Sequence, residues 1–566
     1  MSHPRTVAEA LRDASVTDRG ITVREHDGRA VELPYRALYD TALTIGGALA
    51  AHGLHEGDRV ALVLQEVNEF VRAFFGIACA GLVPVPLCPP AQAGDVATFA
   101  RQSQHILQAA QAAAIITSSD VAPLLALDGL STPPRVLTVN DLLAGPALSA
   151  PAATSLDAIG LLQFTSGSTA APKGVMLSYR NIDANVTAIS GPHGLNTTPE
   201  DSAVSWLPLY HDMGLIGMLL CPVYVKSNAV LLSPTLFLKR PSAWLDAISK
   251  HRATVSFAPN FAYDLCLRRV KPSQIASLDL SSWRIAGCGA EPIRPDTLLA
   301  FAEHFAPAGF KASAFLPSYG LAEHVLAVTL GRDGLVVDRV DSERLVRESQ
   351  AVPADDDTPS VRIVGCGRPF PGHELKIVDD NLKEVPERHV GSIIVRGPSV
   401  MRGYFQEATA SRRALRDGWL HTGDVGYLAD GQLYVCGRTK DMIIRQGRKY
   451  HPPDLESAIT DARAIAVSGV VVIGINHVEQ PDEIVAVIEA RASGRTAELE
   501  DDVRRRIRET SGLELDRVIV APPGTIPRTT SGKVRRAETR LRLQAGTLLS
   551  APAEERSRQP ILAGTD

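Results

Sequence analysis

Hydroxyl, glycine and lysine side chains gather in one short stretch of this sequence, residues 165–174. The hydroxyl groups belong to Thr165, Ser166, Ser168 and Thr169. Gly167 lets the backbone approach a ligand closely, and Lys173 adds a positive charge. A loop of this composition can direct N–H and O–H donors at phosphate oxygens, so it predicts a nucleotide phosphate site. A plain surface turn is the alternative.

The order of these residues differs from that of the common phosphate-binding loop. That loop ends in Gly-Lys-Ser or Gly-Lys-Thr, whereas here Pro172 precedes the lysine and Gly174 follows it. The apolar run Ile159–Phe164, directly before the loop, predicts a buried strand that would position it.

The wider pattern indicates the fold that must hold this loop. From about Val7 to Cys436, apolar strands alternate with amphipathic helices, which predicts an α/β core of stacked, largely parallel sheets covered by helices. Near residue 361 the strands become shorter and are broken by Gly and Pro, which favours a small antiparallel or barrel-like subdomain. After Gly437 the mixture of helices and strands predicts a compact α+β unit.

These patterns divide the chain into segments. We expect an N-terminal core over 1–437, containing a candidate insertion at 335–361 and the small β subdomain at about 361–437. A C-terminal domain is expected over 438–550, and the polar segment 551–566 is expected to be disordered.

Composition excludes several function classes. The 566 residues carry a net charge of −5, so no basic excess favours nucleic acid as a partner. The seven cysteines show neither a C-x-x-C pair nor a metal-ligand spacing, which is typical of a reducing compartment. The longest apolar stretch, Leu215–Val225, is interrupted by Gly217 and Pro222 and is too short to span a bilayer. We therefore expect a cytoplasmic protein without stable membrane insertion.

Further motifs follow the loop in a fixed order. They are Leu207–Gly214 (LPLYHDMG), Gly289–Pro292 (GAEP), Ser318–Glu323 (SYGLAE), His421–Asp424 (HTGD), Gly437–Asp441 (GRTKD) and Pro527–Lys533 (PRTTSGK). This ordered set resembles the adenylate-forming superfamily, which contains acyl-CoA synthetases, nonribosomal adenylation domains and luciferases. The resemblance covers nearly the whole chain and implies ATP as a substrate.

The resemblance implies roles for two charged residues. Lys533 would bridge the substrate carboxylate and the α-phosphate, since bringing two anions together requires positive charge. Glu323 would hold Mg²⁺, a hard cation that prefers one or two carboxylates together with phosphate oxygens. The alternatives are a solvated lysine and a surface glutamate.

The resemblance also implies the remaining site residues. Tyr319, Gly320 and the segment Gly289, Ala290 and Glu291 would flank adenine, and the loop residues would bind the β- and γ-phosphates. Asp424 would accept hydrogen bonds from the ribose hydroxyls, with Arg438 on the same nucleotide. His211 lies at the expected acyl entrance, although a purely structural histidine is the alternative. The expected acyl-binding residues are Leu209, Met213, Gly214, Asn260, Phe261 and Tyr263, and the hinge between domains is Lys440.

Several segments resemble one branch, the fatty acyl-AMP ligases. They include Val85–Pro90 and Pro259–Leu265, and the extra segment at 335–361 matches an insertion that in this branch restricts the C-terminal domain and disfavours CoA. The expected substrate is a fatty acid, and the expected acceptor is a separate acyl carrier protein with a phosphopantetheine arm. An acyl-CoA synthetase and a non-catalytic nucleotide-binding module are the alternatives. One departure, Ala170 where relatives carry Gly, leaves the geometry of the loop open.

Overall fold

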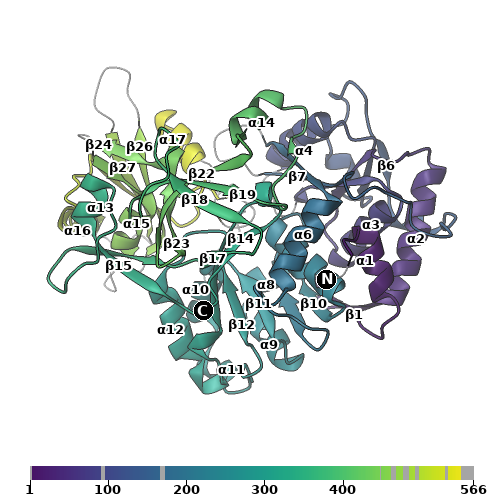
Figure 1. The fold of residues 1–566 in the computed structure, drawn as a ribbon, viewed down its shortest axis with the longest axis horizontal. Coiled ribbons are helices and arrows are strands. Elements are labelled where there is room, and N and C mark those ends of the chain that lie inside the picture. Colours follow the sequence, from purple (N-terminus) through teal and green to yellow (C-terminus); the bar gives the residue numbers. More distant parts are fainter. Residues whose placement is uncertain are drawn as a thin grey trace.

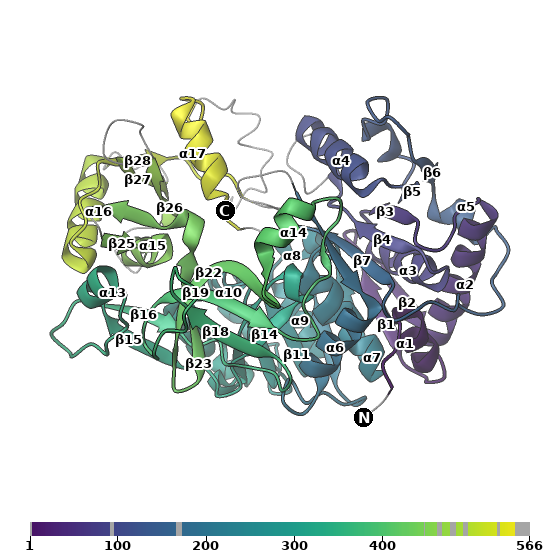
Figure 2. The same ribbon diagram turned by 45° about the horizontal axis from the view of Figure 1, so that its top comes forward.

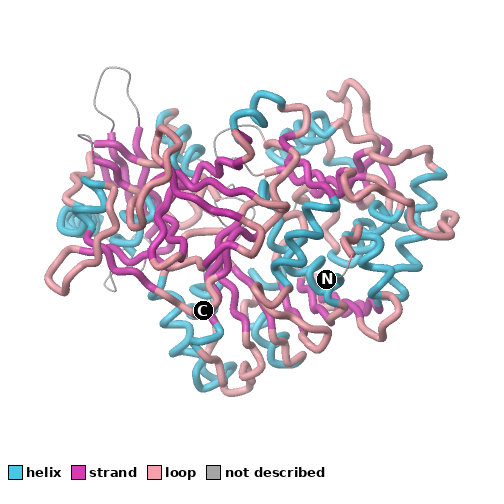
Figure 3. Tube along the Cα trace, viewed as in Figure 1, coloured by secondary structure: helices cyan, strands magenta, loops and turns pink. Residues whose placement is uncertain are grey.

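A computed structural model describes residues 3–90, 96–165, 172–445, 448–460, 467–475, 483–490, 496–528 and 533–549. Sheets and helices are stacked through a large body, and a smaller unit formed by the end of the chain lies at one side of it (Figure 1). The tube in Figure 3 shows strands in the interior of the large body with helices around them. The predicted fold class is confirmed.

The largest sheet runs in the order β17-β14-β13-β12-β11-β9-β10-β1-β2, nine strands among the described residues. Neighbouring strands from β1 to β13 in this order are parallel, and the outer pairs are antiparallel. The strands are β1 (Gly20–Arg24), β2 (Ala30–Pro34), β9 (Ser202–Ser205), β10 (Asn228–Leu232), β11 (Val255–Ala258), β12 (Ile285–Cys288), β13 (Phe315–Gly320), β14 (Ala327–Leu330) and β17 (Arg368–Pro369). Every residue of β11 and β12 is buried, because helices cover both faces of a parallel sheet.

The large body contains two further sheets, and one of them flanks the stretch of residues 165–174. One has the order β4-β3-β5-β6 and the other the order β20-β8-β7. Their strands are β3 (Arg59–Val63), β4 (Val83–Pro86), β5 (Ala114–Thr117), β6 (Arg135–Leu137), β7 (Ile159–Phe164), β8 (Gly174–Ser178) and β20 (Gly403–Tyr404). Since β7 and β8 pair antiparallel, the loop is the tip of a hairpin.

Helices pack around these sheets. The longer ones in the large body are α1 (Val7–Ala14), α2 (Tyr35–Ala51), α3 (Val67–Cys79), α4 (Val96–Ala110), α6 (Tyr179–Ser190), α8 (Pro234–Lys239), α9 (Ser242–Lys250), α10 (Asn260–Arg269) and α12 (Pro295–Phe305). Between β9 and β10 the chain forms a π-helix, η3 (Met213–Leu220), followed by α7 (Cys221–Val225). A π-helix is rare and is frequently found at functional sites.

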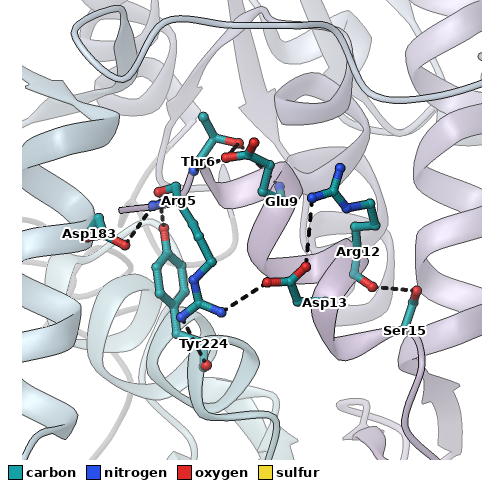
Figure 4. A network of polar contacts seen from close by, with 8 residues as sticks. All are labelled: Arg5, Thr6, Glu9, Arg12, Asp13, Ser15, Asp183 and Tyr224. Carbon is teal, nitrogen blue, oxygen red and sulfur yellow. Dashed lines mark hydrogen bonds and ion pairs between the residues drawn. The ribbon is translucent and has the colours of Figure 1, made fainter. Parts of the chain in front are cut away.

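The N-terminus is tied to the helices beside η3 (Figure 4). The backbone N–H of Arg5 donates to Oδ1 of Asp183 on α6 at 3.0 Å. The Arg5 guanidinium donates to the carbonyl oxygen of Tyr224 on α7 at 3.4 Å, and the Tyr224 hydroxyl donates back to the Arg5 carbonyl at 3.3 Å. Thr6 caps α1. These contacts fix α1 against α6 and α7.

An antiparallel subdomain follows the large sheet. Its sheet has the order β18-β19-β22-β21, with β23 paired to β22. The strands are β18 (Glu374–Val378), β19 (Gly391–Arg396), β21 (Leu415–Arg416), β22 (Trp419–Ala429) and β23 (Gln432–Arg438), and α14 (Ala408–Ala414) precedes β21. The extra segment forms a hairpin, β15 (Val337–Asp341) and β16 (Ser360–Val364), which carries α13 (Ser342–Glu348).

The end of the chain has cores of its own. It contains β24 (Ile443–Arg445), β25 (Arg448–Tyr450), β26 (Val467–Ile475), β27 (Glu483–Ala490), β28 (Arg517–Ala521), α15 (Pro452–Thr460), α16 (Thr496–Ser511) and α17 (Arg536–Gln544). Buried side chains such as Val472, Ile484 and Ile507 form one of these cores. Helix α13 lies directly beside α16 (Figure 2). Among the described helices, none is long and apolar enough to cross a membrane.

Candidate active site

Three predicted nucleotide-binding residues meet around one carboxylate. Asp424 on β22 lies opposite Arg438 on β23, and the Arg438 Nε donates to Asp424 Oδ1 at 3.0 Å. The hydroxyl of Tyr319, on β13, donates to Asp424 Oδ2 at 2.7 Å. The carboxylate is 8% exposed, and its charge raises the pKa of Arg438. Both oxygens of the Asp424 carboxylate are therefore oriented by neighbouring side chains.

Glu323 lies in a short 3₁₀ turn directly after β13, at residues 322–324. Its Oε1 accepts a hydrogen bond from the Tyr404 hydroxyl at 2.9 Å, and its backbone carbonyl accepts one from the N–H of Met401. Burial raises the pKa of Glu323, which means that its charged form lacks full compensation in this site. A cation near this carboxylate would supply that compensation.

The predicted phosphate-binding stretch is described only at its two ends. Thr165 donates its backbone N–H to the Lys173 carbonyl at 3.1 Å, which closes the base of the hairpin. The Lys173 ammonium lies 5.1 Å from the centre of the Tyr404 ring, so Tyr404 contacts both Lys173 and Glu323. Ser166, Gly167, Ser168, Thr169 and Ala170 lie outside the described residues.

A second cluster of charged side chains, separate from that around Asp424, lies near Lys533. Asp212 accepts a hydrogen bond from the N–H of Met213 at 2.7 Å, at the start of η3, and lies 3.5 Å from Nδ1 of His211. Burial acts to raise the pKa of Asp212, but the His211 hydrogen bond and the charges of His211 and Lys533 outweigh it and lower the pKa. Burial lowers the pKa of Lys533, and the charge of Asp212 opposes that effect. Lys533, from the end of the chain, thus lies near a carboxylate of the large body.

The segment Gly289–Glu291 lies at the end of β12 and faces α10. Ala290 adopts a positive φ of 69°, and the Glu291 Oε1 accepts the backbone N–H of Phe261 at 2.7 Å. The charge of Glu291 also acts on Lys533. Asn260 accepts the backbone N–H of Arg294 at 3.0 Å through its side chain, which fixes the start of α10.

The predicted acyl-binding residues divide into two groups. Leu209, Met213 and Gly214 lie beside His211, where a side chain at Gly214 would collide with the Pro208 carbonyl, and Phe261 is half-buried near Glu291. Tyr263 is different. Its ring is fully buried against Trp244, Trp283 and Phe301, and its hydroxyl donates to the Gly287 carbonyl at 2.8 Å. The structure therefore places Tyr263 in the core and away from an acyl surface.

The predicted hinge residue lies where the two parts of the chain join. Lys440 is the middle residue of a 3₁₀ turn, Thr439–Asp441, directly after β23. Burial lowers the pKa of Lys440.

Gly320, the last residue of β13, must remain glycine because a side chain there would meet the Leu326 carbonyl.

Sequence reasoning gave no role to Asp212 or Tyr404. Asp212 directly follows His211 in the LPLYHDMG motif, and this position in the sequence could have indicated that it belongs to the site. Tyr404 reaches the site only because β20 pairs with β8, a long-range pairing that no local pattern reveals.

Comparison with known proteins gives consistent results. The AMP-binding enzyme family matches residues 10–405. A protein of Caulobacter vibrioides with the provisional name of an acyl-CoA synthetase is 39% identical over 96% of both chains. A medium-chain-fatty-acid–[acyl-carrier-protein] ligase of Moorena producens is 33% identical over 91% of this chain and 90% of its own.

A solved structure from a study of fatty acyl-adenylate ligases of E. coli and L. pneumophila superposes with a TM-score of 0.89. It is 39% identical to this chain and covers 96% of it and 98% of its own chain.

Proposed function

We propose, starting from the fact that this chain belongs to the AMP-binding enzyme family, that it is an ATP-dependent fatty acyl-AMP ligase. In the first half-reaction it converts a fatty acid and ATP to acyl-AMP and pyrophosphate. In the second it transfers the acyl group to the phosphopantetheine thiol of a separate carrier protein. The observation that carries this proposal is the meeting of Tyr319 and Arg438 at the Asp424 carboxylate, with Lys533 within range of the charges of Asp212, Glu291 and Asp424.

The mechanism of the first half-reaction follows from these groups. A carboxylate oxygen of the fatty acid attacks the α-phosphorus of ATP, and the bond to the leaving pyrophosphate breaks. Lys533 lies between the two anions and stabilises the negative charge that develops between them. Asp212 favours the charged ammonium and, with His211, borders the carboxylate position.

The nucleotide would be oriented by residues around Asp424. The two oxygens of its carboxylate retain acceptor capacity beyond the bonds from Tyr319 and Arg438, so they suit the ribose hydroxyls. Gly289, Ala290 and Tyr319 would border adenine. Thr165, Lys173 and the loop between them would bind the β- and γ-phosphates.

Mg²⁺ fits one position of this site. Among the described residues, no cluster of three His, Cys, Asp or Glu side chains could hold a metal ion alone. Mg²⁺ on ATP needs only one or two carboxylates besides phosphate oxygens, and the partly buried Glu323 supplies one. When bound, the ion would neutralise charge on the departing pyrophosphate.

The acyl chain would occupy the apolar surface that begins at His211. Met213 opens the apolar π-helix, and Phe261 presents a half-buried ring close to Glu291. An apolar occupant suits the apolar side chains of this segment.

An acyl-CoA synthetase is the second candidate, and the name of the Caulobacter vibrioides relative favours it. Against it stands the 335–361 segment, because α13 contacts the C-terminal unit directly. Ser342 donates its hydroxyl to the Thr510 carbonyl on α16 at 2.7 Å, and Val346 packs into the core that contains Tyr450. We propose that this contact restricts rotation of residues 438–550 and so disfavours CoA.

A cytoplasmic location is also part of the proposal. None of the seven cysteines, all of which lie within the described residues, forms a disulfide bond, and six of them are buried, which suits a reducing compartment.

One experiment separates the three candidates. Purified protein is incubated with ATP and a fatty-acid panel, and pyrophosphate exchange is measured; CoA and carrier proteins are then offered in parallel. Acyl-AMP with transfer to a carrier supports the ligase. Efficient acyl-CoA formation identifies a synthetase, and absence of exchange with every acid identifies a non-catalytic module.

A further inference from the structure

A strained backbone turn follows the proposed metal-binding residue. The N–H of Leu326 donates to the His324 carbonyl at 2.8 Å, which closes a three-residue turn with Val325 at its centre. Val325 has φ 66° and ψ −61°. This form of γ-turn is rare and strained, and a β-branched residue with positive φ is an outlier. Such a conformation persists only where its surroundings over-determine it.

Two buried side chains hold this turn through hydrogen bonds to the next residue, Ala327. Asn185, on α6, donates from Nδ2 to the Ala327 carbonyl at 2.9 Å and accepts the Ala327 N–H at Oδ1 at 3.1 Å. The Nδ1 of His324 donates to the same carbonyl at 2.9 Å. Asn185 and His324 are both 0% exposed. Three hydrogen bonds therefore fix Ala327, the residue directly after the turn.

The protonation of His324 follows from its partners. A carbonyl oxygen can only accept, so Nδ1 carries the proton. The Nε2 of His324 has no hydrogen-bond partner among the described residues. An unpartnered buried acceptor is costly, which argues that the ring is held by its Nδ1 contact and its packing.

Asn185 and His324 together are called the clamp here. Further hydrogen bonds connect this clamp to the antiparallel subdomain. Asn185 Nδ2 also donates to the Ser399 hydroxyl at 3.1 Å, and that hydroxyl lies 2.7 Å from the Nε2 of His373. The rings of His324 and His373 lie 5.2 Å apart, centre to centre. Helix α6, the 322–327 turn and the subdomain thus share one buried network.

The residues directly before the turn are fixed as well. Glu323 is held through its carbonyl by Met401 and through its carboxylate by Tyr404. At the other end of the loop, the N–H of Leu321 donates to the Leu326 carbonyl at 2.9 Å. With both sides fixed, the Glu323 carboxylate has little freedom to change direction.

We propose that Asn185 and His324 are positioning residues, which hold the strained His324–Leu326 turn so that the Glu323 carboxylate points at the metal–phosphate position. Neither residue touches the substrate; each acts through Ala327 and the turn. This inference rests on the proposed function, because it takes the role of Glu323 from it.

The test compares two conservative variants of one residue. Asparagine places its side-chain N–H close to the position of Nδ1, whereas glutamine places it near Nε2. His324→Asn should therefore keep the bond to Ala327, and His324→Gln should lose it. We expect the Mg²⁺ concentration for half-maximal adenylation to rise at least about tenfold in His324→Gln and to stay within about threefold in His324→Asn. The KM for the fatty acid should not change in either variant.

A second readout needs neither metal nor nucleotide. Amide hydrogen exchange in Leu321–Ala327 should be at least about tenfold faster in His324→Gln than in His324→Asn or the parental protein. Tyr35→Phe is the matched control, since it removes a buried side-chain hydrogen bond to a carbonyl far from the turn. It should change neither the Mg²⁺ dependence nor this exchange. Asn185→Leu repeats the test from the other side of the clamp.

Failure of the inference and failure of the proposed function give different results. If Glu323→Gln adenylates at the parental rate, the metal role is wrong. If Glu323→Gln is inactive while His324→Gln and Asn185→Leu keep parental Mg²⁺ dependence and exchange, the positioning role is overturned. Equal disturbance by His324→Asn and His324→Gln would also overturn it, since the position of the donor would then not matter.

Discussion

At the scale of single residues, Asp424 shows how the fold prepares a carboxylate for a ligand. The Tyr319 hydroxyl and the Arg438 guanidinium approach its two oxygens from different strands, so its orientation is set before any nucleotide arrives. Such preorganisation reduces the cost of ordering the site on binding.

Asp424→Ala tests the ribose role. Ribose contacts are present in both ground and transition states, so we expect a KM for ATP raised roughly tenfold or more with a smaller change in kcat. Steady-state pyrophosphate exchange at varied ATP measures both constants. A fixed KM with a collapsed kcat would contradict the assignment. A melting curve serves as the control, because the buried Tyr319 hydroxyl also loses its partner.

Lys533→Ala tests the bridging charge. We expect acyl-adenylate formation to fall by at least about a hundredfold, the scale for removing one group that stabilises transition-state charge. Lys533 is partly buried in the structure, so the folded fraction must be measured alongside the rate. Lys449→Ala, on an exposed position of the same unit, is the matched control. Parental adenylation by Lys533→Ala would refute the role.

At the scale of elements, the 335–361 segment is more deeply built into the fold than a surface loop. Asp338 accepts hydrogen bonds from the Tyr427 hydroxyl at 2.7 Å and from Arg388 at 3.0 Å, and Val340 lies in the core of the antiparallel subdomain. Removing this strand would disturb β22 and β23, which carry Asp424 and Arg438. A point change on α13 is therefore a cleaner probe than a deletion.

Val346→Asp places a charge in the contact between α13 and the C-terminal unit. Val346 is 9% exposed and packs against that unit, so the contact should open and populate other orientations of it. We expect acyl-CoA formation to rise several-fold while adenylation does not rise. Glu343→Lys, on an exposed face of the same helix, is the control. An unchanged CoA rate in a folded, adenylating Val346→Asp protein would contradict the restricting role.

At the scale of the whole molecule, much of the fold could be predicted from the sequence. The run 159–164 forms β7 as predicted, because a buried strand carries a nearly continuous apolar signal. The family and fold class are confirmed. The order of nine strands in the large sheet could not be predicted, since it depends on pairings between segments far apart in the chain.

In the candidate site, too, local motifs predicted some residues, whereas residues that act through tertiary contacts were missed. Motifs predicted Asp424, Glu323 and Lys533 without showing which groups surround them. The Asn185 clamp and Tyr404 stayed hidden because they act through tertiary contacts, and Tyr263 was misplaced because a residue beside site residues can belong to the core. The roles of the site residues and the domain boundaries stay predictions.

Lys440→Pro tests whether the two parts of the molecule rotate about the turn at Thr439–Asp441. The charges of Asp212 and Glu291 act on Lys533 in this structure, which suits the proposed adenylation step, and we propose that acyl transfer uses a second orientation of residues 438–550. Proline fixes φ near −65° and would block a large backbone change at this position. We expect adenylation to remain within about threefold of the parental rate and transfer to the carrier to fall at least about tenfold. Single-turnover measurements of each half-reaction give both values. Equal loss in the two half-reactions would argue for a static junction, because a hinge must affect the second step more than the first.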